Sequence, residues 1–235
     1  MKFDPSPRPA AVVFDFDGVL ADSAQVYLEL YRDVAIHFGK VPPIATVAEW
    51  REWYQPRWER NFEAIGLGGP RLPEAIGWAF SRLRYDRVRI FTGVAAALED
   101  LARDCALAIA SSTRAPLIEE LLEREGLRAR FALVLGGTDR GSDKSEMVGE
   151  ALRTLGAGPD RTVVVGDTTA DVEAARACGL PVVGVTYGWM TAQRLAPARP
   201  EALVAAPGDL PAAVRSVLKA STRVPASGTP GRGRP

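Results

Sequence analysis

Residues 12–20 read Val12-Val13-Phe14-Asp15-Phe16-Asp17-Gly18-Val19-Leu20, an apolar run interrupted by two aspartates and a glycine. Short runs rich in β-branched and aromatic residues predict a β-strand. Side chains alternate along a strand, so Asp15 and Asp17 would share one face if the strand continued through both. Gly18 lets the chain turn away without a steric penalty from a Cβ atom. Two carboxylates this close repel each other, and Mg²⁺, which prefers hard oxygen ligands, would relieve that repulsion.

Three further stretches place polar groups where a strand ends or a helix begins. The apolar run 107–110 is followed by three hydroxyl residues, and the run 162–165 leads into a glycine and two aspartates. Residues 141–146 open an amphipathic segment that begins with a capping-box pattern and a lysine. Ligand sites of open parallel α/β sheets gather at such positions. The candidate residues from these stretches are Ser111, Ser112, Lys144, Asp167 and Asp171.

Together the four stretches resemble the four motifs of the haloacid dehalogenase superfamily, in the family's order and approximate spacing, over about residues 10–215. The chain is most similar to the phosphatase branch that inserts a helical cap after the first motif. The resemblance implies an α/β fold, in which a three-layer, Rossmann-like core with a parallel sheet carries an inserted helical cap domain.

The resemblance also implies catalytic roles. Asp15 would attack phosphorus and become an aspartyl phosphate, while Asp17 would protonate the leaving oxygen and then activate water. Lys144 would neutralise the transferring group and the nucleophile. Ser111, in preference to Ser112, would bind the phosphoryl group together with backbone amides in the first motif, among them that of Gly18. This division of roles fits phosphoryl transfer, where positioning and cations lower the barrier.

The implied cofactor is Mg²⁺. The resemblance assigns its ligands to Asp15, to Asp17 through the backbone carbonyl, and to Asp167. Asp171 would be a second ligand from the fourth motif, or would bind through water.

Several activities remain open within and beyond the superfamily. Dehalogenases lack an acid two residues after the nucleophile, so Asp17 argues against carbon–halogen chemistry. Phosphatases and β-phosphoglucomutase-type sugar phosphomutases share all four motifs, and residues 185–190 resemble phosphoglycolate phosphatases, which favours a small phosphomonoester such as 2-phosphoglycolate. The alternatives from another class are a non-catalytic phosphate-binding regulatory protein and a receiver-type phosphoacceptor, which the acid at Asp17 disfavours.

The pattern of apolar runs predicts two domains. Residues 10–21 and 91–219 alternate strand and helix signals, which indicates a parallel-sheet core, whereas 22–90 reads as almost entirely helical. We expect the first strand at 11–20 and the last cap helix at 74–85. The segment 221–235, rich in Ser, Thr, Pro, Gly and Arg, is typical of a disordered tail.

Composition limits the partners. The 29 basic and 29 acidic residues of the 235-residue chain give a formal net charge of zero, so no overall field favours nucleic acid or a membrane. The two cysteines, Cys105 and Cys178, lack metal-type spacing and predict reduced thiols. No stretch approaches the length of a membrane span. We therefore expect a cytoplasmic monomer or homodimer whose partner is a small phosphorylated metabolite.

The predicted cap is rich in aromatic and arginine side chains, including four of the five tryptophans. Their helical spacing predicts packing within the cap. A sharper hypothesis is that Arg51, Arg57 or Arg60 reaches the cleft and pairs with a second anion on the substrate, such as a carboxylate. His37, the single histidine, would be placed favourably at a helix C-terminus.

Overall fold

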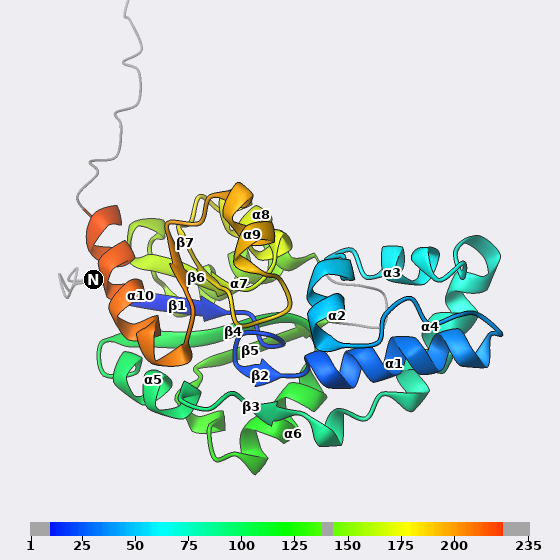
Figure 1. Ribbon diagram of the computed structural model, residues 1–235. Helices are drawn as coiled ribbons and strands as arrows, with labels where there is room; N and C mark the ends of the chain where they lie inside the picture. Colours follow the sequence, from blue (N-terminus) through cyan, green and yellow to red (C-terminus); the bar gives the residue numbers. More distant parts are fainter. Residues whose placement is uncertain (1–9, 138–142, 223–235) are drawn as a thin grey trace, which may run out of the picture.

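The computed structural model describes residues 10–137 and 143–222. Within them, a six-stranded sheet has the order β5-β4-β1-β6-β7-β8, and each neighbouring pair is parallel. This arrangement confirms the predicted α/β fold (Figure 1). The strands are β1 (Ala10–Phe14), β4 (Cys105–Arg114), β5 (Leu133–Gly137), β6 (Thr162–Gly166), β7 (Val182–Val185) and β8 (Ala202–Val204).

Helices cover both faces of this sheet because successive side chains of its strands point to opposite sides. Val12 and Phe14 of β1 belong to the apolar cluster under one set of helices, and Val13 between them belongs to the cluster under the other. The first set is α5 (Val94–Leu101), α6 (Ala115–Arg124) and α10 (Leu210–Ser221). The second is α7 (Lys144–Leu155) and α8 (Thr169–Ala177), and a short α9 (Ala192–Leu195) follows β7.

A second helical cluster lies beyond the carboxyl ends of the strands (Figure 1). We call residues 22–90 the cap; their status as a separate domain remains a prediction. The cap joins the core through a short antiparallel pair, β2 (Ala21–Asp22) and β3 (Arg89–Ile90). Its helices are α1 (Ala24–His37), α2 (Val47–Trp53), α3 (Glu59–Ala64) and α4 (Leu72–Arg82). Its apolar cluster includes the four tryptophans of this segment, which confirms the prediction that they pack within the cap.

Local signals in the sequence account for several element ends. Thr46 forms a complete capping box with Glu49 at the start of α2, as its spacing predicts. The short 3₁₀ helices are η1 (Gly69–Arg71), η2 (Tyr85–Arg87), η3 (Arg128–Arg130), η4 (Pro159–Arg161), η5 (Ala196–Ala198) and η6 (Pro207–Asp209). No helix among the described residues is long and apolar enough to cross a membrane.

Three expected boundaries were wrong. The first strand ends at Phe14 instead of continuing to residue 20, because the amides of Leu20 and Ala21 fold back onto the carbonyl of Phe16 and close a turn. The last cap helix runs from Leu72 to Arg82. The expected tail begins too early, since α10 extends through Ser221. The rest of the predicted tail, residues 223–235, lies outside the described residues.

Candidate active site

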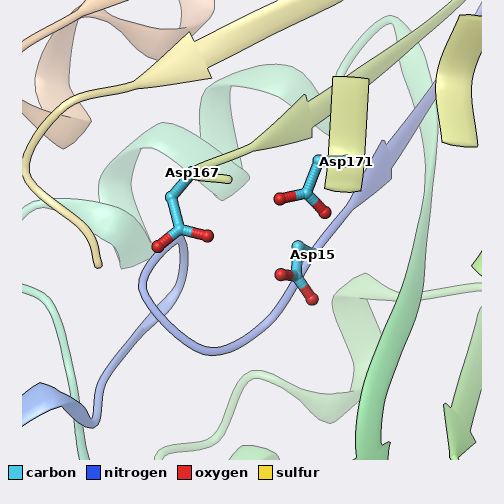
Figure 2. Close-up of side chains that lie close together, drawn as sticks. All are labelled: Asp15, Asp167 and Asp171. Atoms are coloured by element: carbon cyan, nitrogen blue, oxygen red, sulfur yellow. The ribbon is translucent and has the colours of Figure 1, made fainter. Parts of the chain in front are cut away.

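Three buried aspartates meet at the carboxyl edge of the sheet. Asp15 follows β1, Asp167 follows β6, and Asp171 lies in the first turn of α8. Each offers one carboxylate oxygen, and these oxygens lie within 4.8 Å of one another. Figure 2 shows the three carboxylates gathered around a common centre. Three negative charges out of contact with water strongly repel, so this cluster needs compensating positive charge.

Local structure brings these side chains together. Strands β1 and β6 are neighbours, and the Asp15 amide continues their ladder by donating to the Val165 carbonyl at 2.9 Å. Asp171 is the N3 residue of a capping box at the start of α8: its Oδ2 accepts from the Thr168 amide at 2.9 Å and from the Thr168 hydroxyl at 2.7 Å. Adjacent strand ends and a helix cap therefore converge on one point.

Lys144 supplies positive charge to this cluster. It is the first residue of α7, where the Asp143 side chain caps the helix by accepting the Ser145 amide hydrogen at 2.8 Å. The ammonium Nζ lies 2.8 Å from Asp15 Oδ2 and also forms an ion pair with Asp171 Oδ1. Burial opposes its charge, but the attraction of Asp15 and Asp171 raises the pKa of Lys144 above its ordinary value.

One lysine does not balance three carboxylates. Burial raises the pKa of Asp15 to about 6 against the opposing attraction of Lys144. Burial, followed by repulsion from Asp171 and Asp15, raises the pKa of Asp167 well above its ordinary value. Asp167 Oδ1 is buried and has no hydrogen-bond partner in the part of the chain that the structure describes. An unpartnered carboxylate oxygen beside two other carboxylates fits a divalent cation, which would satisfy that oxygen and offset the repulsion.

The carboxylate of Asp17 lies outside this three-aspartate cluster. Its oxygens accept the Tyr85 hydroxyl hydrogen at 3.1 and 3.2 Å, and Oδ2 also accepts the Thr113 hydroxyl hydrogen at 2.5 Å. Burial raises the pKa of Asp17 despite these donors. The side chains of Asp15 and Asp17 therefore occupy different environments. Asp15 lies among carboxylates and beside Lys144, and Asp17 faces hydroxyl groups.

The two serines after β4's apolar run differ sharply. Ser111 is buried, and its Oγ accepts the Thr113 amide hydrogen at 3.3 Å, whereas Ser112 is exposed. Ser111 and Thr113 are two residues apart, as expected for side chains on one side of a strand. This placement favours Ser111 over Ser112 at the site.

Position 18 requires a glycine for two reasons, its backbone conformation and the lack of room for a side chain. Its φ of +80° lies in the region that favours glycine, and a Cβ atom there would lie 2.0 Å from Asp167 Oδ2. Glycine at this position lets Asp167 approach the turn after β1. The Gly18 amide donates to the Ala21 carbonyl at 2.8 Å, and its contact with phosphate stays a prediction.

Sequence reasoning missed the partners of Asp17 and Asp167. Thr113 carried a usable signal, because it follows Ser111 at the strand period. Tyr85 carried none, since 68 residues separate it from Asp17. Trp189 donates its amide hydrogen to Asp167 Oδ2 at 2.6 Å. A backbone amide leaves no compositional trace, so only the fold could identify this contact.

The cap arginines differ from one another in their surroundings. Arg51 is partly buried and donates from Nη2 to the carbonyls of Thr186 and Met190 in the core, while Arg57 and Arg60 are exposed. His37 stacks on Trp78 with ring centroids 4.3 Å apart. The proposed contact between a cap arginine and a substrate anion remains a prediction.

Known proteins resemble this chain in sequence and in fold. The sequence model of the haloacid dehalogenase-like hydrolases matches residues 12–185. A phosphoglycolate phosphatase of Synechococcus elongatus is 34% identical over 211 residues, which are 89% of this chain and 99% of that protein. A phosphorylated carbohydrates phosphatase of Thermotoga maritima is 30% identical over 205 residues, covering 83% of this chain and 93% of that protein.

A solved structure extends the comparison to the fold. A hydrolase of the haloacid dehalogenase-like family from Streptococcus pneumoniae superposes with a TM-score of 0.76 at 22% identity, covering 87% of this chain and 98% of that one. At this identity the likeness concerns the fold alone.

Proposed function

Because this chain belongs to the haloacid dehalogenase-like hydrolase family, we propose that it is a Mg²⁺-dependent phosphatase that hydrolyses a small phosphomonoester through a phosphorylated Asp15. The observation that carries the proposal is the division of labour at the site. Asp15 lies beside a lysine and two further carboxylates, while Asp17 is buried among hydroxyl donors. This arrangement separates a nucleophile from an acid/base.

Mg²⁺ would be held by Asp15 and Asp167, with Asp171 as a further or water-mediated ligand and Asp17 contributing its backbone carbonyl. The unpartnered Oδ1 of Asp167 supports this assignment. When bound, the ion would offset the negative charge of the aspartates and of the phosphoryl oxygens, which is the contribution that phosphoryl transfer requires.

The chain's own residues would carry two steps. In the first, an Asp15 oxygen attacks phosphorus, the ester P–O bond breaks, and the leaving oxygen takes the proton of Asp17. In the second, a water molecule attacks the phosphorus of the aspartyl phosphate and gives its proton back to Asp17, which frees Asp15 and inorganic phosphate. Lys144 stabilises the negative charge of Asp15 and of the phosphoryl group during both steps, and the Ser111 hydroxyl binds a phosphoryl oxygen.

The raised pKa of Asp17 supports its role in the first step. A carboxyl group with its ordinary pKa would be almost fully ionised near neutral pH and a poor proton donor. Burial keeps more of Asp17 in the acid form.

We propose 2-phosphoglycolate as the first substrate to test, and sugar phosphates as the second. The names of the relatives from Synechococcus elongatus and Thermotoga maritima support these two classes. Core residues would handle the phosphoryl group common to both, so the cap would choose between them.

The test is phosphate release from a panel of phosphomonoesters, with Mg²⁺ and with EDTA, for the wild type and Asp15→Asn in parallel. We expect metal-dependent release that Asp15→Asn abolishes. A phosphomutase would instead interconvert sugar phosphates in the presence of a bisphosphate and release little phosphate. Release that survives in Asp15→Asn would overturn the proposed nucleophile.

A further inference from the structure

The backbone and side chain of Trp189 contact different parts of the protein. Its amide donates to Asp167 Oδ2 in the core, as described above. The residue as a whole is 8% exposed, and its indole belongs to the apolar cluster of the cap. Its ring centroid lies 4.8 Å from that of Tyr27, 4.7 Å from that of Tyr54 and 5.6 Å from that of Trp50. One core residue thus contacts both the carboxylate cluster and the cap interior.

Two arginines bind across the same junction in opposite directions. Arg51 of the cap donates from Nη2 to the Thr186 carbonyl and, at 3.2 Å, to the Met190 carbonyl. Arg194 of the core donates at 2.7 Å to the Arg51 carbonyl and at 2.8 Å to the Tyr54 carbonyl. The last carbonyls of a helix favour a cation, so the C-terminal end of α2 is a suitable partner for Arg194.

The segment that carries Trp189 also fits tightly against the site. A Cβ atom at Gly188 would lie 2.2 Å from the Gly18 carbonyl oxygen and 2.4 Å from Asp167 Oδ2. Side chains in such packed regions cannot move independently. If the cap moved away from the core, the Trp189 ring would lose its aromatic neighbours in the cap. The segment around Gly188 would also lose the hydrogen bonds that Arg51 and Arg194 make across the junction.

Among the described residues, one hydrogen bond orients the Asp167 carboxylate within this packing. Its Oδ2 accepts the Trp189 amide hydrogen, and its Oδ1 has no hydrogen-bond partner among residues 10–137 and 143–222. We propose that Trp189 is a positioning residue for Asp167, and that a clasp made of Arg51, Trp189 and Arg194 couples docking of the cap to the orientation of this carboxylate. The part of the inference that concerns metal affinity rests on the proposed cation site.

Coupling of this kind is reciprocal. If a docked cap orients Asp167 for a divalent cation, then a bound cation must favour the docked cap by the same factor. The clasp would therefore couple docking of the cap to binding of the metal ion, although the two take place in different parts of the chain.

The test compares Arg194→Ala with Arg176→Ala in the full-length protein. Arg176 is the control, because its guanidinium also donates to two backbone carbonyls, those of Leu180 and Arg199, and both belong to the core. Its additional ion pair with Glu201 also lies within the core. The first readout is hydrogen exchange at the Trp189 amide without metal. The second is calorimetric binding of Mg²⁺.

We expect Arg194→Ala to speed exchange at the Trp189 amide and to weaken Mg²⁺ binding by about fivefold or more, the lower end of usual coupling between sites. Arg51→Ala, which opens the clasp from the other side, should do the same. Arg176→Ala should leave both readouts at their wild-type values. In the wild type, Mg²⁺ should slow exchange at the Trp189 amide.

The outcomes separate this inference from the proposed function. Wild-type exchange at Trp189 in both Arg194→Ala and Arg51→Ala would overturn the clasp, whatever the metal does. Faster exchange with unchanged Mg²⁺ affinity would overturn the coupling. If the wild type binds no Mg²⁺, the proposed cofactor is wrong, while the exchange data still decide whether the clasp positions Trp189.

Discussion

The Tyr85 hydroxyl lies 3.1 and 3.2 Å from the two carboxylate oxygens of Asp17 and donates its hydrogen to that carboxylate. Tyr85 belongs to η2, in the segment that returns the chain from the cap to the core. The proposed acid/base therefore accepts a hydrogen bond from a residue in the connection between cap and core. This relationship gives the cap a means to influence chemistry without contacting phosphorus.

Tyr85→Phe should lower kcat about tenfold with little change in KM. The variant keeps the ring but loses a hydrogen bond to a carboxylate, which is worth about 1.5–3 kcal/mol. Steady-state kinetics would measure the split between kcat and KM. Tyr31→Phe is the control, because it removes a buried tyrosine hydroxyl within the cap, where the ring centroids of Tyr31 and Phe62 lie 5.1 Å apart. An unchanged kcat in Tyr85→Phe would show that Asp17 needs no such support.

Asp17→Asn should reduce turnover by about 100-fold or more, the usual minimum for losing a general acid/base. Its affinity for Mg²⁺ should stay close to that of the wild type, because the carboxylate points to Tyr85 and Thr113 and not into the aspartate cluster. Phosphate release and calorimetry would measure the two properties. Near-normal turnover would contradict the role assigned to Asp17.

Lys144→Met should destabilise the metal-free protein by about 3 kcal/mol, because it leaves buried Asp15 and Asp171 without their cation. Mg²⁺ should restore part of this loss by supplying positive charge to the same carboxylates. Urea unfolding with and without Mg²⁺ would measure both effects. Lys219→Met, at an exposed position of α10, is the control. A loss that Mg²⁺ leaves unchanged would count against a cation at this cluster.

Gly188→Ala should lower both stability and Mg²⁺ affinity, since its Cβ would overlap the Gly18 carbonyl and Asp167 Oδ2. Gly77→Ala should have the opposite sign. Gly77 lies within α4. Apart from its chain neighbours and its own helix backbone, no atom of the described residues lies within 4 Å of the place that a methyl group would take, so alanine should stabilise the helix by up to about 1 kcal/mol. Thermal unfolding of the two variants would compare them directly. Equal effects would mean that the approach of Gly188 to Asp167 is unimportant.

Alkaline pH should destabilise the protein through its tyrosines. Burial raises the pKa of every tyrosine above the ordinary value of 10.0: Tyr27, Tyr31, Tyr54, Tyr85 and Tyr187. Above that value the unfolded chain releases protons that the folded chain retains, so stability is intact below about pH 10 and falls as pH rises. Ultraviolet absorbance should show tyrosinate only as the protein unfolds. Titration of a tyrosine near pH 10 in the folded state would contradict this expectation.

Local patterns were sufficient for much of the fold. The apolar runs around 107–110 and 162–165 became β4 and β6, because a buried strand needs apolar side chains on both faces. Strand β8 was missed, since its three residues carry too short a pattern. The end of β1 was misplaced because Val19 and Leu20 continue the apolar run while the backbone already turns.

For the candidate site as well, the sequence predicted some features and not others. Motif order on the chain singled out Asp15, Lys144, Asp167 and Asp171, and the structure brings these four side chains together at one edge of the sheet. The partner of each charge could not be predicted. The contact between Lys144 and Asp171 depends on how α7 and α8 pack on the sheet, and that packing is set by apolar side chains remote from both residues.

Residue types and their spacing along the chain determined most core strands, the capping box at Thr46 and the chemistry available at the sheet edge, because these depend on neighbours within a few residues. Only the tertiary structure decided that Asp17 faces Tyr85, that Asp167 is held by the Trp189 amide, and that Arg51 and Arg194 bind in opposite directions across the junction of cap and core. Such contacts join positions tens to more than a hundred residues apart, and several use backbone groups that every residue carries. These contacts stabilise the protein only after the core and the cap have packed against each other.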